Sequence, residues 1–290
     1  MKRILITGAT GNIGFEVVRC LYKNNVDQKF VAGVRNMDKA REKFKSYPSL
    51  DFVYFDFENP ETFHSALNGV DRVFLLRPPH ISNIKKYFSP LIKEIKAYEK
   101  IEVVFLSVQG AEKSSWVPHN KIEKLIYEAK LNYVFLRPSY FMQNITTTLI
   151  DDIKNRNKII LPAGKAKFNW IDVKNIGEVS AIVLNEFDQY KNRAYNVTGY
   201  ENKGFHEVVK LINETTGMDI EYQNKNPLLF FWLKRKDGLK SGLILVIIML
   251  HFIPRFQKEP QITSFYEDIT GKKPTSLREF FESEKSTLKS

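Results

Sequence analysis

The sequence has little cysteine, because Cys20 is the single one among 290 residues. A lone cysteine cannot form an internal disulfide, and Cys20 lies in an apolar helical stretch where a small buried side chain is expected. Cys-x-x-Cys pairs, metal-ligand clusters and nucleophile triads are also missing from the pattern, so no metal is expected and metalloenzymes and hydrolases are poor candidates. The apolar stretch before Gly8 is shorter than the hydrophobic region of a signal peptide. A reducing, cytoplasmic location is the expectation.

Long hydrophobic runs are scarce as well, and the longest one covers residues 243–250 (LILVIIML). Spanning a bilayer takes about 20 mostly apolar residues, whereas this run is followed by His251, Pro254 and Arg255. We expect a buried helix of the C-terminal region here, and membrane association is not expected. The dense basic segment 234–240 (KRKDGLK) leaves a surface-lying anchor as the alternative.

Acidic residues are outnumbered, with 33 Asp and Glu against 44 Lys and Arg and a formal net charge of +11. Nucleic-acid binding requires clustered basic residues, but most lysines here are interspersed with acids, as in KIEKLIYEAK, which is typical of solvated helix faces. We therefore expect no nucleic-acid partner. Attraction of an anionic cofactor explains part of the charge more simply.

The chain contains a regular alternation of short apolar runs and amphipathic segments up to about residue 137. Six runs have the composition of buried strands: 3–7, 30–34, 51–56, 72–77, 103–107 and 133–137. Continuous apolar strands separated by helices predict a parallel sheet with helices on both faces. The predicted fold is α/β, a Rossmann-like doubly wound sheet over residues 1–150 followed by a small α/β substrate lobe over 151–290, with some late elements returning to the first domain.

A glycine-rich turn joins the first strand to the first helix in the segment TGATGNIGFEVV. Gly8, Gly11 and Gly14 are spaced by three, and the last of them opens an apolar-periodic helix. Gly8 and Gly11 let the backbone turn tightly and approach a pyrophosphate, while Gly14 lets helix and strand pack closely. The helix N-terminus adds free N–H donors. This combination of strand, loop and helix predicts dinucleotide binding.

The end of the second strand indicates which dinucleotide is bound. Enzymes that choose NAD usually carry an acid there, whereas this sequence has Arg35. A guanidinium at this position suits the 2′-phosphate of NADP, with Lys39 one turn along as support; the alternative is a solvent-exposed arginine. Asp56, at the end of the third strand, is placed either to reach the adenine edge or to cap the following helix. The expected cofactor is NADP(H).

The glycine loop, VRNMDKA, FLSVQGA, LNYVFLRPSYFMQN, NWIDVKNIGEVSAIVL and ITGKKPTSLREFF occur in this order, and the chain thereby resembles the NmrA-like atypical short-chain dehydrogenases/reductases over nearly its whole length. That family includes NADPH-dependent quinone and triphenylmethane reductases, whose bacterial branch the pattern resembles, and also NADP-binding regulators without turnover. The resemblance places a first set of residues around adenosine and pyrophosphate and beside the ribose, and a second set near the nicotinamide. The first set is Gly8, Thr10, Gly11, Asn12, Ile13, Gly14, Arg35, Asp56, Phe57, Leu75, Leu76 and Arg77; the second is Ser107, Pro138, Tyr140 and Phe141.

Carbonyl reductases of the wider superfamily use a Tyr-x-x-x-Lys pair as acid and base, and none of the 13 tyrosines here has a lysine four residues later. His119 and Glu123 stand at the aligned positions. They share one edge of a predicted helix, where Glu123 would favour the charged form of the imidazole. The alternative is that His119 merely begins the helix after Pro118. We take His119, Glu123 and Ser107 as candidate catalytic residues.

A proton-transfer residue is not essential for every substrate, because the nicotinamide carries the hydride and a quinone or dye-like cation can take a proton from water. The sequence therefore predicts an NADPH-dependent reductase of a flat, electron-poor small molecule. An NADP(H)-sensing regulator with a protein partner, and a membrane-surface protein, are the alternatives. Asn144 is a candidate polar contact to substrate or cofactor, and Asp172 is interpreted as a helix cap.

Overall fold

The structure is a computed structural model that describes residues 2–23 and 28–289. It divides into two compact units: the first holds the chain up to Pro138, Val173–Val197 and Asp268–Gly271, and the second holds Ser139–Asp172, Thr198–Glu267 and Lys272–Ser290. The chain leaves the first unit directly after the sixth strand, upstream of the expected boundary near residue 150. The reason is that Tyr140–Phe141 already pairs with Trp170–Ile171 of the second unit.

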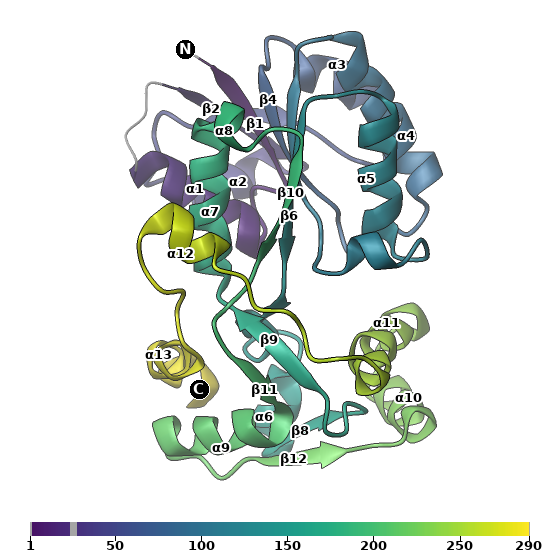
Figure 1. The fold of residues 1–290 in the computed structure, drawn as a ribbon, viewed down its shortest axis with the longest axis vertical. Helices are drawn as coiled ribbons and strands as arrows, with labels where there is room; N and C mark the ends of the chain where they lie inside the picture. Colours follow the sequence, from purple (N-terminus) through teal and green to yellow (C-terminus); the bar gives the residue numbers. More distant parts are fainter. Residues whose placement is uncertain (1, 24–27, 290) are drawn as a thin grey trace. The chain divides into compact units, whose positions relative to one another are not determined.

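The first unit is built on a parallel sheet of seven strands in the order β10-β6-β5-β4-β1-β2-β3 (Figure 1). All six expected strands are present, which confirms the Rossmann-like α/β prediction. The seventh, β10, was missed and pairs in parallel with β6 at the edge of the sheet. The strands are β1 (Arg3–Thr7), β2 (Lys29–Val34), β3 (Asp51–Tyr54), β4 (Arg72–Leu76), β5 (Glu102–Leu106), β6 (Tyr133–Pro138) and β10 (Arg193–Val197).

Helices cover both faces of this sheet. One layer contains α1 packed on α7, and the other contains α4 packed on α3 and α5 (Figure 1). Cys20 is buried on α1, as expected, and burial raises the pKa of its thiol to about 11. The helices of this unit are α1 (Asn12–Lys23), α2 (Met37–Lys43), α3 (Glu61–Leu67), α4 (Ile84–Ala97), α5 (Pro118–Glu128), α7 (Val173–Asn185) and α8 (Phe187–Tyr190), with the 3-10 turn η1 (Ala111–Lys113).

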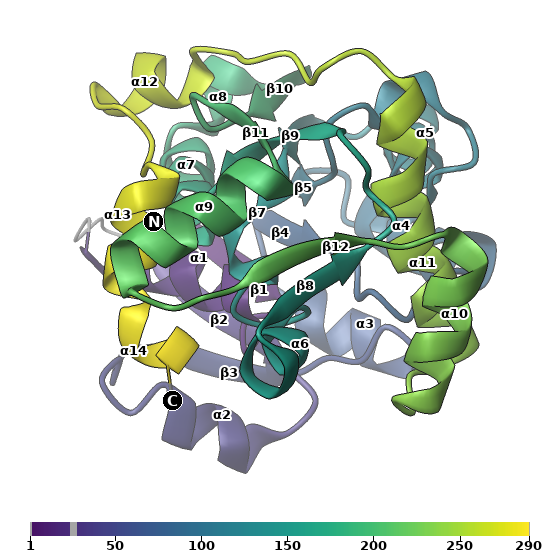
Figure 2. The ribbon, with the colours of Figure 1, turned by 90° about the horizontal axis from the view of Figure 1, so that it is seen from below.

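The second unit has two small sheets, one of order β11-β9-β7 and one that pairs β12 with β8 in parallel (Figure 2). Its strands are β7 (Tyr140–Phe141), β8 (Lys158–Leu161), β9 (Lys167–Ile171), β11 (Asn202–Gly204) and β12 (Glu221–Asn224). Its helices are α6 (Ile150–Arg156), α9 (Phe205–Thr216), α10 (Pro227–Lys236), α11 (Ser241–Phe252), α13 (Leu277–Ser283) and α14 (Lys285–Lys289), with 3-10 turns η2 (Met142–Asn144) and η3 (Ile253–Phe256); α12 (Phe265–Thr270) includes residues of both units.

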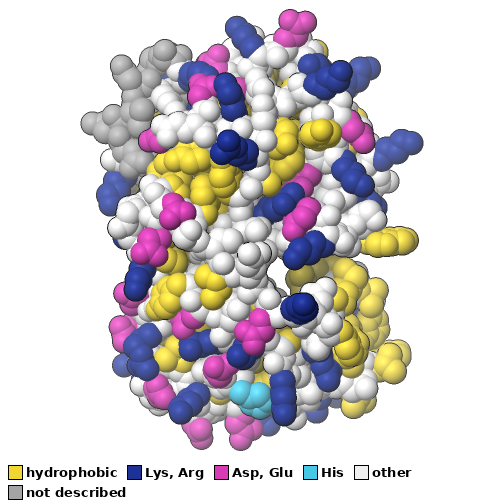
Figure 3. Space-filling view, viewed as in Figure 1, with side chains coloured by type: hydrophobic (Ala, Val, Ile, Leu, Met, Phe, Trp, Pro, Cys, Tyr) yellow, Lys and Arg dark blue, Asp and Glu magenta, His cyan; other side chains and the backbone are white. Residues whose placement is uncertain are grey.

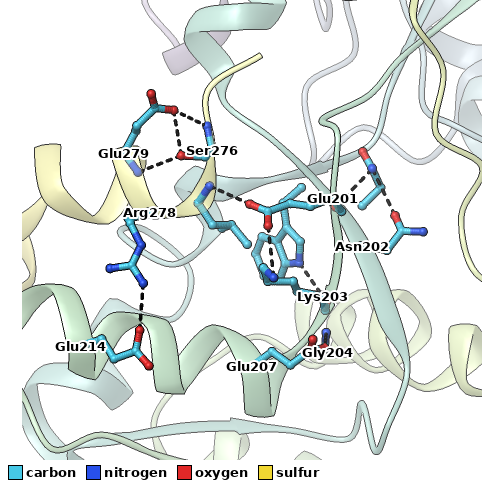
Figure 4. A network of polar contacts seen from close by, with 12 residues as sticks. Glu201, Asn202, Lys203, Gly204, Glu207, Glu214, Ser276, Arg278 and Glu279 are labelled. Carbon is cyan, nitrogen blue, oxygen red and sulfur yellow. Dashed lines mark hydrogen bonds and ion pairs between the residues drawn. The ribbon is translucent and has the colours of Figure 1, made fainter. Parts of the chain in front are cut away.

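Polar contacts attach α13 to this second unit (Figure 4). The Leu277 N–H donates to Glu201 Oε1 at 3.0 Å, and Arg278 pairs with Glu214 at 2.9 Å. Ser276 and Glu279 form a capping box at the N-terminus of α13. The segment near the chain end therefore completes the core of this unit, to which it contributes Leu277, Phe280 and Phe281.

The apolar run 243–250 forms most of α11, and the expectation that it is a buried helix is wrong. Only Ile244, Ile247 and His251 of α11 are buried, whereas Leu250 is 54% exposed. The run is apolar on every side of the helix, so hydrophobicity alone did not reveal that one side lacks a protein partner. No helix in the described part of the chain combines the length and apolar character that crossing a bilayer requires.

Candidate functional site

The glycine loop connects β1 to α1 at the carboxyl edge of the parallel sheet, where dinucleotides bind in this fold class. Gly8 has φ +62°, a conformation that side chains other than glycine rarely adopt. The Gly11 N–H donates to the Gly8 carbonyl at 2.9 Å and closes the turn. Thr7 fixes the strand end, because its hydroxyl donates to the Phe74 carbonyl and accepts from the Leu76 N–H, both at 2.9 Å.

Gly14 is the point of closest packing in this loop. A Cβ at this position would lie 2.3 Å from the Gly8 carbonyl oxygen and 2.7 Å from Ala9 Cα, so no side chain fits. Gly8, Gly11 and Asn12 are exposed in front of it, where α1 begins and its first N–H groups lack intrahelical acceptors. The cradle that the three glycines form, and the unfilled donors of α1, fit a pyrophosphate. Thr10 is exposed and Ile13 is partly exposed in the same turn.

Basic side chains surround the loop. Arg35 follows β2 and is exposed, and no carboxylate in the described chain forms an ion pair with it. Asn36 caps α2 by accepting from the Lys39 N–H at 2.9 Å, and the Lys39 side chain is exposed. Lys43, at the other end of α2, donates to the Thr10 carbonyl at 2.7 Å. The loop is thus bordered by cations, which suits a phosphate-rich ligand.

Several residues that the resemblance places around the adenosine have other structural contacts here. Asp56 accepts from the Glu58 N–H at 3.0 Å, which stabilises a turn, and α3 is preceded by Pro60, so the alternative role of Asp56 as a helix cap is not found. The side chains of Phe57 and Leu75 are buried in the hydrophobic core of the first unit. Leu76 lies against Gly8. Their contacts to a cofactor remain predictions.

Arg77 and His119 meet at the ends of β4 and α5. Arg77 Nε donates to His119 Nε2 at 3.4 Å, and its Nη1 donates to the Ile81 carbonyl at 2.7 Å. The imidazole stacks on Phe105 at a centroid distance of 6.1 Å. Burial, with a further contribution from the Arg77 charge, lowers the pKa of His119 to about 3. The imidazole is therefore neutral near pH 7, with Nε2 as an acceptor and Nδ1 carrying the proton.

Glu123 does not act on His119, and the expectation that it favours a charged imidazole is wrong. Both oxygens of Glu123 are held by Arg137, with Nε donating to Oε1 at 2.9 Å and Nη2 donating to Oε2 at 2.7 Å. Arg137 also pairs with Glu112 at 3.0 Å. A bidentate pair of this kind fixes α5 to β6, and in the described part of the chain no hydrogen bond joins Glu123 to His119.

Ser107 has a buried hydroxyl oxygen with no hydrogen-bond partner in the described structure. It follows β5, and its N–H donates to the Leu136 carbonyl at 2.7 Å. Buried hydroxyls almost always have partners, so an unpaired one at the carboxyl edge of a central strand is a candidate ligand contact. Pro138, at the end of the adjacent β6, is buried. Both were assigned to the nicotinamide by resemblance, and those roles remain predictions.

Tyr140 belongs to the second unit, where its side chain is partly buried against the hydrophobic core. Its hydroxyl is 2.9 Å from His251 Nε2, and His251 Nδ1 is 2.6 Å from the Ile247 carbonyl, so the tautomer with Nδ1–H donates to the carbonyl and accepts from the phenol. Burial raises the pKa of Tyr140, which a hydrogen bond from Asn144 lowers in part. Burial lowers the pKa of His251 to about 4. Neither group titrates near pH 7.

The depressed pKa of His251 predicts how stability depends on pH. Between about pH 4 and 6.5 the unfolded imidazole binds a proton that the folded one does not, so the free energy of unfolding rises with pH in this window and falls on acidification. The free energy of unfolding is expected to fall by a few kcal/mol across this pH window. The free energy of unfolding of His251→Gln should fall less than that of the wild type between about pH 7 and pH 5, as measured by urea unfolding. Parallel pH curves for the two proteins would contradict the assignment.

Asn144 and Asp172 lie close to this tyrosine in sequence or space but have partners of their own. Asn144 ends η2 and hydrogen-bonds the Tyr140 phenol. Asp172 directly precedes α7 and accepts from Gln143 Nε2 at 2.6 Å. Phe141 is partly exposed. A direct role of Asn144 in binding a substrate remains a prediction.

Sequence reasoning missed Lys43, Arg137 and His251. Lys43 lies at the last turn of α2, and its position on the helix face of Lys39 was the available signal. Arg137 was visible only as part of a strand, and its pairing with Glu123 depends on how α5 crosses β6. His251 was noted only as the residue that ends the apolar run, and its partner Tyr140 lies 111 residues away in the sequence. Among the described residues no group of three or more His, Cys, Asp or Glu could hold a metal ion.

Comparisons with known proteins show the family and the fold. The model of the NmrA-like family matches residues 1–233. Prestalk A differentiation protein A of Dictyostelium discoideum is 30% identical over 96% of this chain and 90% of its own length. An NAD(P)H azoreductase of Xenophilus azovorans is 29% identical over 76% of each chain. The structure of an NADPH-dependent quinone oxidoreductase from Escherichia coli, complexed with NADPH, superposes with a TM-score of 0.85 at 21% identity, covering 97% of this chain and 99% of that one, and shares the fold.

Proposed function

The chain belongs to the NmrA-like family, and from this premise we propose that it binds NADP(H) at the glycine loop and reduces a flat, electron-poor substrate such as a quinone. The observation that carries the proposal is the turn from Gly8 to Asn12 at the start of α1, where Gly8, Gly11 and Asn12 are exposed beside Arg35, an arginine without an ion-pair partner in the described part of the chain. Relatives named NAD(P)H azoreductase and quinone oxidoreductase 2 support a reductase.

The residues around the loop fit the cofactor. The N–H groups at the start of α1 would hold the pyrophosphate, and Arg35 would hold the 2′-phosphate through its fork of donors. Lys43 would compensate further negative charge, since it already borders the loop at the Thr10 carbonyl. When bound, the nicotinamide supplies the hydride. The Ser107 hydroxyl, which has no partner in the described chain, would orient the ring or the substrate.

The protonation state of His119 favours one class of substrate. A neutral imidazole with a pKa of about 3 is a weak proton donor near pH 7, and Arg77 already occupies its Nε2. Reduction of a ketone needs a strong acid to protonate the developing alkoxide. A quinone or a delocalised dye cation disperses the added electron pair and can be protonated by water. The chain therefore suits electron-poor conjugated acceptors better than ketones.

The experiment that tests the proposal mixes the protein with NADPH and a panel of quinones, azo dyes and simple ketones, and follows the loss of nicotinamide absorbance. We expect reduction of at least one quinone or dye and none of the ketones. Rapid reduction of an ordinary ketone would show that a proton donor has been overlooked. No reduction of any conjugated acceptor would refute the reductase proposal.

His119→Ala is expected to lower kcat/KM for the best acceptor by about ten- to a hundredfold, the effect of a positioning residue. NADPH affinity should be retained, because His119 is not among the residues expected around the cofactor. The pH profile of the wild-type rate should show no inflection from His119 near neutral pH. His64→Ala, which removes an exposed histidine of α3, serves as the matched control. An unchanged rate in His119→Ala would remove this residue from the site.

A second candidate function is an NADP(H)-sensing regulator without turnover. Two observations favour it: the candidate acid is held neutral, and one full-length relative is named for differentiation rather than for a reaction. A regulator of this kind would bind NADPH and NADP with different effects on a protein partner. Tight NADPH binding without consumption of NADPH in the presence of any acceptor would favour it over the enzyme.

A further inference from the structure

The outer side of the hairpin formed by α10 and α11 is apolar and open to solvent. Figure 3 shows hydrophobic side chains gathered over these two helices, which pack against each other in the second unit (Figure 2). We call this surface the hairpin face and define it by six exposed residues: Leu229, Trp232, Val246, Met249, Leu250 and Phe256. Trp232 is 70% exposed and Phe256 is 76% exposed. Contiguous apolar surfaces of this kind mark interaction sites.

The hairpin is firmly attached on its other side, so the hairpin face is not a frayed segment. On α10, Phe230 is buried and Lys234 is held by Asp152 and Asp237. Arg156 adds two bonds to Asp237, at 2.8 and 2.6 Å. On α11, Ile244 and Ile247 pack into the core of the second unit, and His251 is bonded to Tyr140. Opposite residues of the same helices are therefore directed outward in a fixed arrangement.

Basic residues border the hairpin face. Arg235 and Lys236 end α10, Lys240 precedes α11, and Arg255 and Lys258 follow it; all five are exposed. Among the described residues none of these five forms an ion pair with a carboxylate. An apolar helical surface with an aromatic residue and a border of Lys and Arg is typical of helices that lie in the headgroup region of a bilayer.

A second copy of this chain is a less suitable occupant. Two hairpin faces brought together by a two-fold axis would also bring together two basic borders, which repel each other. The acids nearest in sequence are already engaged, since Asp237 pairs with Arg156 and Glu259 pairs with Lys167 at 3.0 Å. An anionic lipid bilayer is complementary to the hairpin face and to its basic border. Its hydrocarbon can take up the apolar side chains, and its phosphates or carboxylates can pair with the cations.

We propose that the α10–α11 hairpin docks this protein onto the surface of an anionic lipid bilayer. Helices of 10 and 12 residues are too short to cross about 30 Å of hydrocarbon, so they lie in the interface and do not span it. The hairpin face enters the region between headgroups and acyl chains, and the five basic residues contact lipid headgroups. This inference does not depend on the proposed reductase function.

Sedimentation with lipid vesicles tests the proposal on the full-length protein. Vesicles of phosphatidylcholine with roughly one third phosphatidylserine should pellet the protein, high salt should release it, and pure phosphatidylcholine should retain far less. Val246→Glu/Leu250→Glu should lower the partition coefficient more than tenfold, because two charges would have to enter the interface. Lys236→Glu/Lys240→Glu should lower the partition coefficient to a similar extent. Because this variant changes only exposed residues, it remains informative if the first variant is unstable.

Lys93→Glu/Lys96→Glu, the same charge change on exposed positions of α4, is the matched control and should bind anionic vesicles nearly as well as the wild type. Absence of sedimentation with anionic vesicles would overturn the proposal, as would equal binding to neutral and anionic vesicles. Binding of both hairpin variants to anionic vesicles at the level of the wild type would overturn it too. A stable dimer in sedimentation velocity that Val246→Glu/Leu250→Glu dissociates, without vesicle binding, would assign the hairpin face to a second copy instead.

Discussion

Gly11→Val is expected to abolish NADPH binding while leaving the fold intact. Gly11 is exposed at the front of the loop, and its Cβ would meet only the Gly8 carbonyl, at 3.3 Å. That contact is tight but is relieved by a small shift, whereas an isopropyl group would fill the space through which a pyrophosphate reaches the start of α1. Calorimetric titration should detect no heat of binding at concentrations that saturate the wild type.

Gly242→Val is the matched control for this variant, because a Cβ at Gly242 has no neighbour within 4 Å. It should bind NADPH as the wild type does. Circular dichroism and the melting temperature of Gly11→Val establish that the chain is folded. A folded Gly11→Val that binds NADPH normally would show that the glycine loop is not the cofactor site.

Arg35→Asp is expected to weaken NADPH binding by about 3 kcal/mol, or a hundredfold or more, because a charge-assisted contact is replaced by repulsion from a carboxylate. The affinity for NADH should change much less, since that cofactor has no 2′-phosphate. Arg41→Asp, an equal charge reversal at an exposed position of α2, controls for the general loss of positive charge. Calorimetry with both cofactors measures the preference directly.

A result in which Arg35→Asp and Arg41→Asp weaken NADPH equally would mean that Arg35 acts through long-range charge alone. Equal affinity of the wild type for NADPH and NADH would mean that the residue after β2 does not select the cofactor. In either case the specificity would have to come from other cations at the loop, of which Lys43 is the first to test.

The inner strands of the parallel sheet were predictable because they are largely buried and therefore appear as continuous apolar runs, and β3, at one edge, was predictable from its aromatic and β-branched residues. The β10 strand was not, because it lies at the sheet edge, where Arg193 and Ala194 are exposed and Tyr195 is partly so. Edge strands lack the burial on both sides that makes a run apolar, so RAYNV carries no strand signal. Its position is determined by pairing with β6, a contact distant in sequence.

The parts of the candidate site that lie within one short segment were predictable from the sequence. The contacts between segments distant in the sequence were not. The glycine loop is such a segment, and its geometry follows from the requirement for a left-handed Gly8 and a Gly14 without a side chain. The spacing of His119 and Glu123 predicted a pair, but Arg137 on β6 binds Glu123 and Arg77 on the β4 side approaches His119. Helix periodicity contains no information about those two arginines.

The environment of the apolar run of α11, in the second unit, was also not predictable from the local sequence. Its residues are apolar on all sides of the helix, which predicts burial in a globular protein. Only the side that carries Ile244, Ile247 and His251 has a partner in the described chain. Sequence determined that the helix would be apolar, whereas the packing of the second unit determined which side remained open.

Counting turnovers tests the central claim that this chain is an NADPH-dependent reductase. The protein is mixed with a large excess of NADPH and the acceptor that reacts fastest in the panel, and the amount of NADPH consumed is compared with the amount of protein. The account predicts consumption many times greater than the protein concentration, lost in Gly11→Val. Tight binding of NADPH with no more than one equivalent consumed, for every conjugated acceptor, would contradict it.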